Sequence, residues 1–216
     1  MKDLKYVPIV TYILIGINVL VFFVESASGG SQDTENILRL GGAYTPYIIQ
    51  DSEWYRLFNS MFLHFGFEHI FSNMISLFCL GQYVEQYFGK IKYIVIYILS
   101  GLLGNVLSML VETYTGNYSV SVGASGAVCG VLGAMVIFAM DSRTKGTFPM
   151  YRMIIAILLV VGSGFSEKNI DNMAHIGGLI SGFLTAYTFY YFQKKNGSEV
   201  YVIDGDDAEE QDFYVF

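Results

Sequence analysis

The chain has 216 residues, of which 53% are hydrophobic and only 14% are charged. A soluble domain carries about a quarter charged residues, so charge is missing from long stretches, and a lipid bilayer is the simplest solvent that permits this. Seven of the 19 acidic residues lie between Glu199 and Asp212, so the net charge of −7 largely reflects an acidic tail. No segment is basic enough to indicate nucleic-acid binding.

Six apolar segments have the composition of membrane-spanning helices, which need about 20 mostly apolar residues. They are 7–24, 67–88, 91–111, 122–140, 150–165 and 171–192. The first is too long for the core of a signal peptide, and the fifth is short and begins beside Arg152. Cys79 and Cys129 both fall inside these segments, so we expect neither a disulfide bond nor a redox role.

The distribution of basic residues predicts the orientation of the chain in the membrane. If the amino terminus is cytoplasmic, nine Lys and Arg residues fall inside and three, Arg39, Arg56 and Lys168, fall outside. This bias fits the positive-inside rule. We therefore expect one membrane domain over residues 1–192, cytoplasmic termini, and a disordered acidic cytoplasmic tail over residues 193–216.

The one long connection, residues 25–66, lies on the outer side in this orientation. It carries aromatic residues, among them Trp54 and Tyr55, before it reaches His64. Aromatic side chains of this kind gather at the membrane interface. We expect a loop partly embedded in the outer leaflet, with a helical turn or two.

Four polar side chains lie near the outer ends of predicted helices. His69 and Asn73 are in the second segment, Ser125 is in the fourth, and His175 is in the sixth. These three segments all begin on the outside, so the four residues come to a similar depth. Polar groups inside a bilayer are costly and rare, which makes this convergence informative.

Small residues allow the serine and histidine helices to approach closely. Gly126 follows Ser125, and Gly178 and Gly182 share the helix face of His175. The Ser125 hydroxyl could then reach a His175 ring nitrogen, and a serine with a histidine base is the minimum for nucleophilic acyl transfer. Backbone N–H groups in the first turn of the serine helix, with Asn73 and His69, could stabilise an oxyanion.

Each of these residues also has a structural interpretation when it is taken alone. A serine in a glycine-rich membrane helix usually packs or bonds its own helix, and Asn73 could bridge helices. Asp171 could orient the His175 ring, but we favour a helix cap. The spacing of His64, Glu68 and His69 does not match a zinc motif, so we expect no metal and no cofactor.

The motifs taken together resemble the rhomboid intramembrane serine proteases. The matching segments are HFGFEHIFSN (64–73), GQYVEQYFG (81–89), GASG (123–126) and AHIGGLISG (174–182). The resemblance implies an all-α bundle of six transmembrane helices with a semi-embedded loop after the first. It also implies a cofactor-free dyad of Ser125 as nucleophile and His175 as base. His69 and Asn73, with the Ser125 amide, would form the oxyanion hole.

The resemblance implies supporting roles for further residues, and it has two departures. The supporting positions are Trp54, Arg56, His64, Gly81, Glu85, Gly89, Gly123, Gly126, Gly178 and Gly182. Tyr55 stands where the family often has a second tryptophan. Cys129 occupies a position, one turn after the nucleophile, that is often aromatic and stacks on the catalytic imidazole.

The implied function is that of an endopeptidase of the cell membrane. It would cleave transmembrane helices of membrane-protein substrates near the outer face of the bilayer. The main alternative is a non-catalytic relative that binds transmembrane helices, although such relatives typically lose the serine or the histidine. A small transporter is disfavoured because its ionisable residues would lie near the centres of the spans. The substrate and the oligomeric state stay open.

Overall fold

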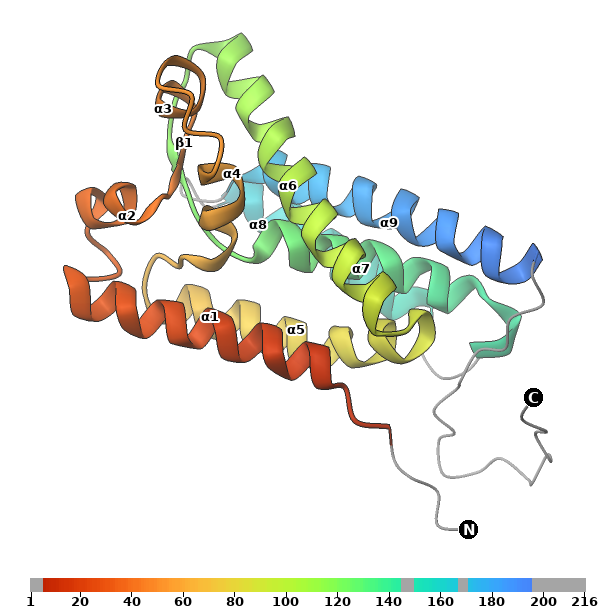
Figure 1. Ribbon diagram of the computed structural model, residues 1–216. Helices are drawn as coiled ribbons and strands as arrows, with labels where there is room; N and C mark the ends of the chain where they lie inside the picture. The colour runs from red at the N-terminus through yellow and green to blue at the C-terminus, as the bar shows by residue number, and fades with distance from the viewer. Residues whose placement is uncertain (1–5, 145–149, 167–170, 196–216) are drawn as a thin grey trace.

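A computed structural model describes residues 6–144, 150–166 and 171–195 (Figure 1). Helices dominate these ranges, and each of the long helices lies within a few residues of a predicted apolar segment. The long helices are α1 (Ile9–Ser28), α5 (Phe67–Phe88), α6 (Lys90–Thr115), α7 (Ser125–Met140), α8 (Met150–Ser166) and α9 (Asn172–Lys195). The positions of the predicted helices are therefore confirmed.

Only part of the membrane prediction follows from the helices themselves. The helices α1 and α6 are long and apolar enough to cross a bilayer, with mean hydropathies of 2.1 and 2.2. The helix α7 is apolar but has 16 residues, which span roughly 24 Å against a hydrocarbon core of about 30 Å. A count of six membrane spans stays a prediction.

The helix α7 forms the centre of the bundle. Twelve of its 16 residues are buried, and it packs against α5, α6, α8 and α9. By contrast, the outer helices expose large apolar side chains such as Leu20, Ile91 and Leu184. Exposure of many large apolar side chains on several helices suits contact with lipid.

The segment between α1 and α5 is more ordered than the predicted loop. It holds the short helices α2 (Thr34–Leu40), α3 (Thr45–Gln50) and α4 (Arg56–Asn59), the 3-10 helix η1 (Ser60–Phe62) and the strand β1 (Ala43–Tyr44). Figure 1 shows this segment at one end of the bundle, beside α6. Strand β1 pairs antiparallel with β2 (Val120–Ser121), just before α7. The segment is thereby joined to the start of the central helix.

The helix α1 is anchored to α5 by Glu85, whose side chain is fully buried. The Glu85 carboxylate accepts hydrogen bonds from the backbone N–H groups of Val10 and Thr11 and from the Thr11 hydroxyl, at 2.8–3.0 Å. The first N–H groups of a helix have no partner within the helix, and the helix dipole favours a negative charge beside them. Glu85 therefore caps α1 from a neighbouring helix.

The carboxyl-terminal boundary of the predicted membrane domain needs a correction. The acidic tail was placed from residue 193, but α9 continues through Gln193 to Lys195. The helix continues because Gln193 is buried against the bundle, whereas Lys194 and Lys195 form a basic last turn. The rest of the tail, residues 196–216, lies outside the described residues.

Candidate active site

The structure places Ser125 as the first residue of α7. The preceding turn is held by two hydrogen bonds: the Gly123 N–H donates to the Ser60 carbonyl (2.9 Å), and the Ala124 N–H donates to His64 Nε2 (3.4 Å). Gly123 has φ +132°, a conformation that residues with a side chain rarely adopt. The first-turn amides of α7, which lack carbonyl partners in the helix, therefore start at Ser125.

The helices α7 and α9 touch backbone to backbone. A Cβ atom on Gly178 would lie 2.0 Å from the Gly126 carbonyl oxygen, and one on Gly182 would lie 2.2 Å from that of Gly130. No side chain fits in such gaps. This is the close approach that small residues permit between membrane helices.

This contact brings Ser125 and His175 to the same level. A Cβ atom on Gly126 would lie 3.4 Å from the Ala174 carbonyl oxygen, so the residues adjoining Ser125 and His175 in the chain touch. Within the described ranges no hydrogen bond joins the two side chains, and His175 Nδ1 is buried without a hydrogen-bond partner. The backbones beside the two residues are in contact, but the geometry between the Ser125 and His175 side chains is open, with no hydrogen bond between them.

Of the two predicted oxyanion side chains, His69 lies close to the turn before Ser125. A Cβ atom on Gly123 would lie 2.6 Å from His69 Cε1 and 3.6 Å from the Ser125 hydroxyl oxygen. The His69 ring thus borders the serine. The Asn73 side chain donates to the His69 carbonyl in its own helix (3.0 Å). A side-chain amide carries two N–H bonds, so Asn73 has a second one to offer.

His64 links the segment before α5 to the segment before α7. Its Nδ1–H donates to the Phe62 carbonyl (3.2 Å), which leaves Nε2 as the acceptor for the Ala124 amide. Its ring also packs edge-on against the His69 ring, with centroids 5.3 Å apart. Burial, with the neighbouring His69, lowers the pKa of His64 to about 3. The ring is therefore neutral at physiological pH, as its acceptor role requires.

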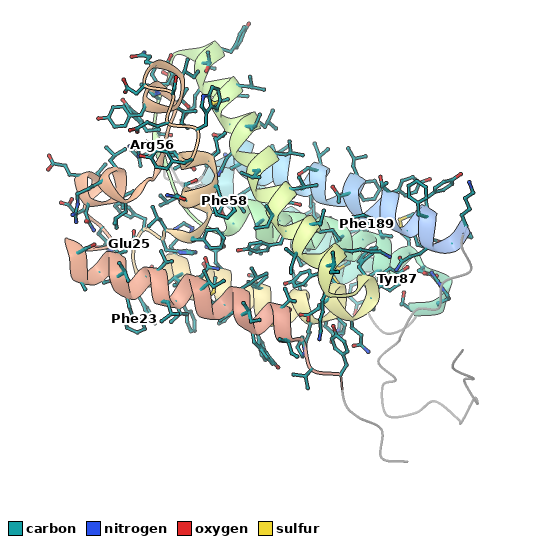
Figure 2. All side chains as sticks on the ribbon, in the orientation of Figure 1. Phe23, Glu25, Arg56, Phe58, Tyr87 and Phe189 are labelled. Carbon is teal, nitrogen blue, oxygen red and sulfur yellow. The ribbon has the colours of Figure 1, made fainter. Side chains whose placement is uncertain are left out.

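Arg56 organises the short helices at the same end of the bundle (Figure 2). Its guanidinium donates to the backbone carbonyls of Leu38 (2.7 Å) and Gly42 (3.0 Å) and stacks over the Tyr47 ring, 5.0 Å from the centroid. Trp54, in contrast, is 54% exposed, which suits a position at a lipid interface. Within the described residues neither side chain is hydrogen-bonded to Ser125, and a supporting role for both stays a prediction.

Asp171 acts in the structure as a cap for α9. One carboxylate oxygen accepts from the Ala174 N–H (2.9 Å) and the other from the Ser108 hydroxyl (2.7 Å). This contact agrees with the favoured interpretation of Asp171 as a cap rather than a third catalytic residue. Cys129 lies one turn into α7 and is buried.

Sequence reasoning missed three supports of this site. Ser60 accepts from the turn before Ser125, and Asn105 donates to the Leu57 carbonyl (2.7 Å) and to Ser60 Oγ (3.0 Å). The third is the pairing of β1 with β2. Asn105 could have been found, because a polar side chain within the apolar segment 91–111 marks a buried hydrogen bond. The strand pairing left no local pattern in the sequence.

Fold and site together define a helical membrane protein with a serine and a histidine at the contact of two helix ends. The family model described as Rhomboid domain matches residues 51–192. The chain belongs to the rhomboid family, whose members are embedded in membranes.

Individual relatives agree with this assignment. The chain is 37% identical to Rhomboid protease GluP of Bacillus subtilis (strain 168) over 184 residues, which cover 83% of this chain and 34% of GluP. It is 37% identical to RHOMBOID-like protein 5 of Arabidopsis thaliana over 153 residues, 69% of this chain and 48% of that protein. It is 32% identical to Putative rhomboid protease YdcA of Bacillus subtilis over 196 residues, 89% of this chain and 92% of YdcA. The chain spans less than half the length of the first two.

Proposed function

We propose that the protein is an intramembrane serine endopeptidase that cleaves transmembrane helices of membrane-protein substrates near the outer face of the bilayer. One observation carries the proposal. The glycine contacts between α7 and α9 bring Ser125, at a helix amino terminus, to the level of His175. The names of relatives such as Rhomboid protease GluP support the same chemistry.

In the proposed reaction the Ser125 hydroxyl oxygen attacks the scissile carbonyl carbon, and His175 takes the hydroxyl proton. The carbonyl oxygen gains the negative charge. The Ser125 N–H, the second Asn73 N–H and the His69 ring would stabilise that charge, and a single donor of this kind is worth about 3–4 kcal/mol. His175 then gives its proton to the leaving amine, and the C–N bond breaks.

Hydrolysis of the acyl-enzyme completes the cycle. A water molecule attacks the ester carbonyl while His175 accepts a proton from it, and the returning proton restores the Ser125 hydroxyl. No cofactor is needed for either half. Peptide bonds in a helix are shielded, so the substrate must present an unwound segment to Ser125.

The proposed orientation is cytoplasmic termini in the cell membrane, with the site open to the outside. Figure 1 shows that α1 begins and α9 ends at the end of the bundle opposite the short helices. The basic side chains Lys92 and Lys194 belong to that opposite end, over the rings of Phe189 and Tyr190. A basic cytoplasmic face fits the positive-inside rule.

A non-catalytic binder of transmembrane helices is the second candidate. Two observations favour it: the open geometry between Ser125 and His175, and the cysteine at position 129 instead of a ring that stacks on the imidazole. The retention of both Ser125 and His175 argues for the enzyme.

Covalent labelling of the serine tests the proposal without knowledge of the substrate. A fluorophosphonate reacts with a serine hydroxyl only when a base activates it. Purified protein should be labelled at Ser125, as located by peptide mass spectrometry, and His175→Ala should abolish the labelling. Ser181→Ala is the matched control, because the Ser181 hydroxyl bonds its own helix at the Gly177 carbonyl. An unlabelled wild type would favour the binder.

A further inference from the structure

Glu25 is a fully buried carboxyl group in the last turn of α1, beside the short helices (Figure 2). The apolar segment predicted from the sequence ended before it, and none of the roles assigned to the site residues involves it. A carboxyl group is almost never fully buried unless a partner holds it there. Its contacts therefore identify what it does.

The Glu25 side chain binds the backbone of His64, the residue whose ring contacts the turn before Ser125. One carboxylate oxygen accepts a hydrogen bond from the His64 backbone N–H (3.1 Å), and the other is buried without a hydrogen-bond partner. The Glu25 backbone carbonyl accepts from the Asn36 side chain (3.0 Å) and the Gly30 N–H (3.2 Å). The end of α1 is thereby fixed both to α2 and to the segment before α5.

His64 in turn contacts the residue that precedes Ser125. The His64 ring accepts the N–H of Ala124, the residue before Ser125, and it packs against the His69 ring. Both His64 and Ala124 are completely buried, so neither has solvent as a substitute partner. Two hydrogen bonds therefore separate the Glu25 carboxyl group from the first residue of α7.

We infer that Glu25 is a positioning residue for the active site: by holding the His64 backbone it fixes the ring that sets the Ala124–Ser125 turn. The inference rests on the proposed function and extends it to α1. It assigns the first helix, which carries none of the reacting groups, a share in the geometry of the nucleophile.

The chemistry of the contact makes the assignment specific. Glutamine at position 25 keeps an oxygen that accepts the His64 N–H, so Glu25→Gln should preserve the link. Aspartate is one methylene shorter, which withdraws the acceptor by more than an ångström. Alanine removes the acceptor and leaves a buried donor unpaired. A role limited to charge would not order the variants in this way, because Glu25→Gln removes the charge and keeps the acceptor.

A matched control exists on the same helix. Asn18 is also fully buried, and its side chain bonds the Leu14 carbonyl (2.8 Å) and the Tyr97 hydroxyl (3.5 Å). It lies seven residues before Glu25 on the same helix face and makes no hydrogen bond to the His64 segment. Asn18→Ala therefore perturbs the packing of α1 without touching the proposed link.

The test measures kcat and KM for cleavage of a transmembrane reporter in proteoliposomes, and hydrogen–deuterium exchange of residues 120–128. We expect Glu25→Ala to lower kcat at least tenfold with KM within twofold of wild type, and to speed exchange of that segment. Glu25→Asp should resemble Glu25→Ala. Glu25→Gln should keep kcat within threefold of wild type, and Asn18→Ala should keep both kcat and the exchange rate.

Two results would overturn the inference. One is a Glu25→Ala variant with unchanged kcat and exchange. The other is an Asn18→Ala variant that loses as much as Glu25→Ala in both readouts, since the effect would then be general destabilisation. If the wild type cleaves no reporter, the proposed function fails instead, and the exchange comparison still decides whether Glu25 holds the Ser125 turn.

Discussion

Replacement of Gly178 by alanine should separate the two helices that carry Ser125 and His175. The new Cβ atom would lie 2.0 Å from the Gly126 carbonyl oxygen, and real Cβ contacts essentially never fall under 3.0 Å. The backbones must therefore part by about 1.0 Å, the difference between these two values. Because Gly126 directly follows Ser125, the displacement acts on the nucleophile itself.

The expected loss is large for a single methyl group. Overpacking of this kind costs about 1–3 kcal/mol of stability. A misplacement of about 1 Å at a catalytic centre costs roughly 100-fold in rate, which corresponds to about 2.7 kcal/mol of transition-state stabilisation. We expect kcat/KM for a transmembrane reporter in proteoliposomes to fall by about two orders of magnitude in Gly178→Ala.

Gly16→Ala is the control for this prediction. Gly16 lies within α1, and a Cβ atom there would meet nothing within 4 Å, so activity should not change. The reasoning is refuted if Gly178→Ala keeps kcat/KM within threefold of wild type, because the helices would then tolerate a contact that the structure excludes.

Three further predictions concern the supports of the site. The pKa of His64 is about 3 in the fold, against about 6.5 in the unfolded chain, so His64 stabilises the protein above pH 6.5 and that stability is lost as pH falls toward 3. The thermal midpoint of wild type should therefore fall more steeply than that of His64→Gln between pH 7 and pH 4.5, and parallel curves would contradict this. Arg56→Lys should destabilise the fold by about 1–3 kcal/mol in denaturant unfolding, because the guanidinium bonds the Leu38 and Gly42 carbonyls through one nitrogen and the Glu53 carboxylate through another, and a single ammonium nitrogen cannot reach all three; an unchanged midpoint speaks against that role. Asp171→Asn should keep the pH profile of kcat and most of the activity if Asp171 caps α9, whereas a shifted profile would identify it as a partner of His175.

The long helices were predictable because a bilayer imposes its length and polarity on the chain. Apolar runs of about 20 residues leave a strong signal, and α5 follows its predicted segment, 67–88, from end to end. The end of α1 was missed by four residues. The predicted segment ends at Val24, just before the charged Glu25, yet the helix continues to Ser28. The hydrogen bond that the buried carboxyl group accepts comes from the distant His64 N–H, which the local sequence does not reveal.

The segment between α1 and α5 was less predictable because its order comes from distant contacts. Strand β1 pairs with residues that are far away along the chain: Ala43 pairs with Ser121 and Tyr44 with Val120. Two-residue strands show no alternating pattern, so the sequence around Ala43 carries no sign of its partner. Arg56 likewise binds backbone carbonyls. Because every residue has a backbone carbonyl, the sequence does not indicate which of them Arg56 binds.

The candidate site was predictable in its placement, because topology alone puts three helix ends at one depth. The structure brings His69 beside Gly123 and places Gly126 against Ala174, next to Ser125 and His175 respectively. The sequence could not predict the open geometry between Ser125 and His175, since side-chain rotation is set by packing and by substrate. It also could not predict that the Asn73 amide bonds its own helix.

Cleavage of a transmembrane reporter by purified protein in proteoliposomes tests the central claim most directly. Wild type would be compared with Ser125→Ala, His175→Ala and the control Ser181→Ala, on reporters that carry helix-breaking residues. The account predicts that wild type and Ser181→Ala cut the reporter and that the other two variants do not. Cutting by Ser125→Ala at the wild-type rate would contradict it, because the nucleophile would then be another group.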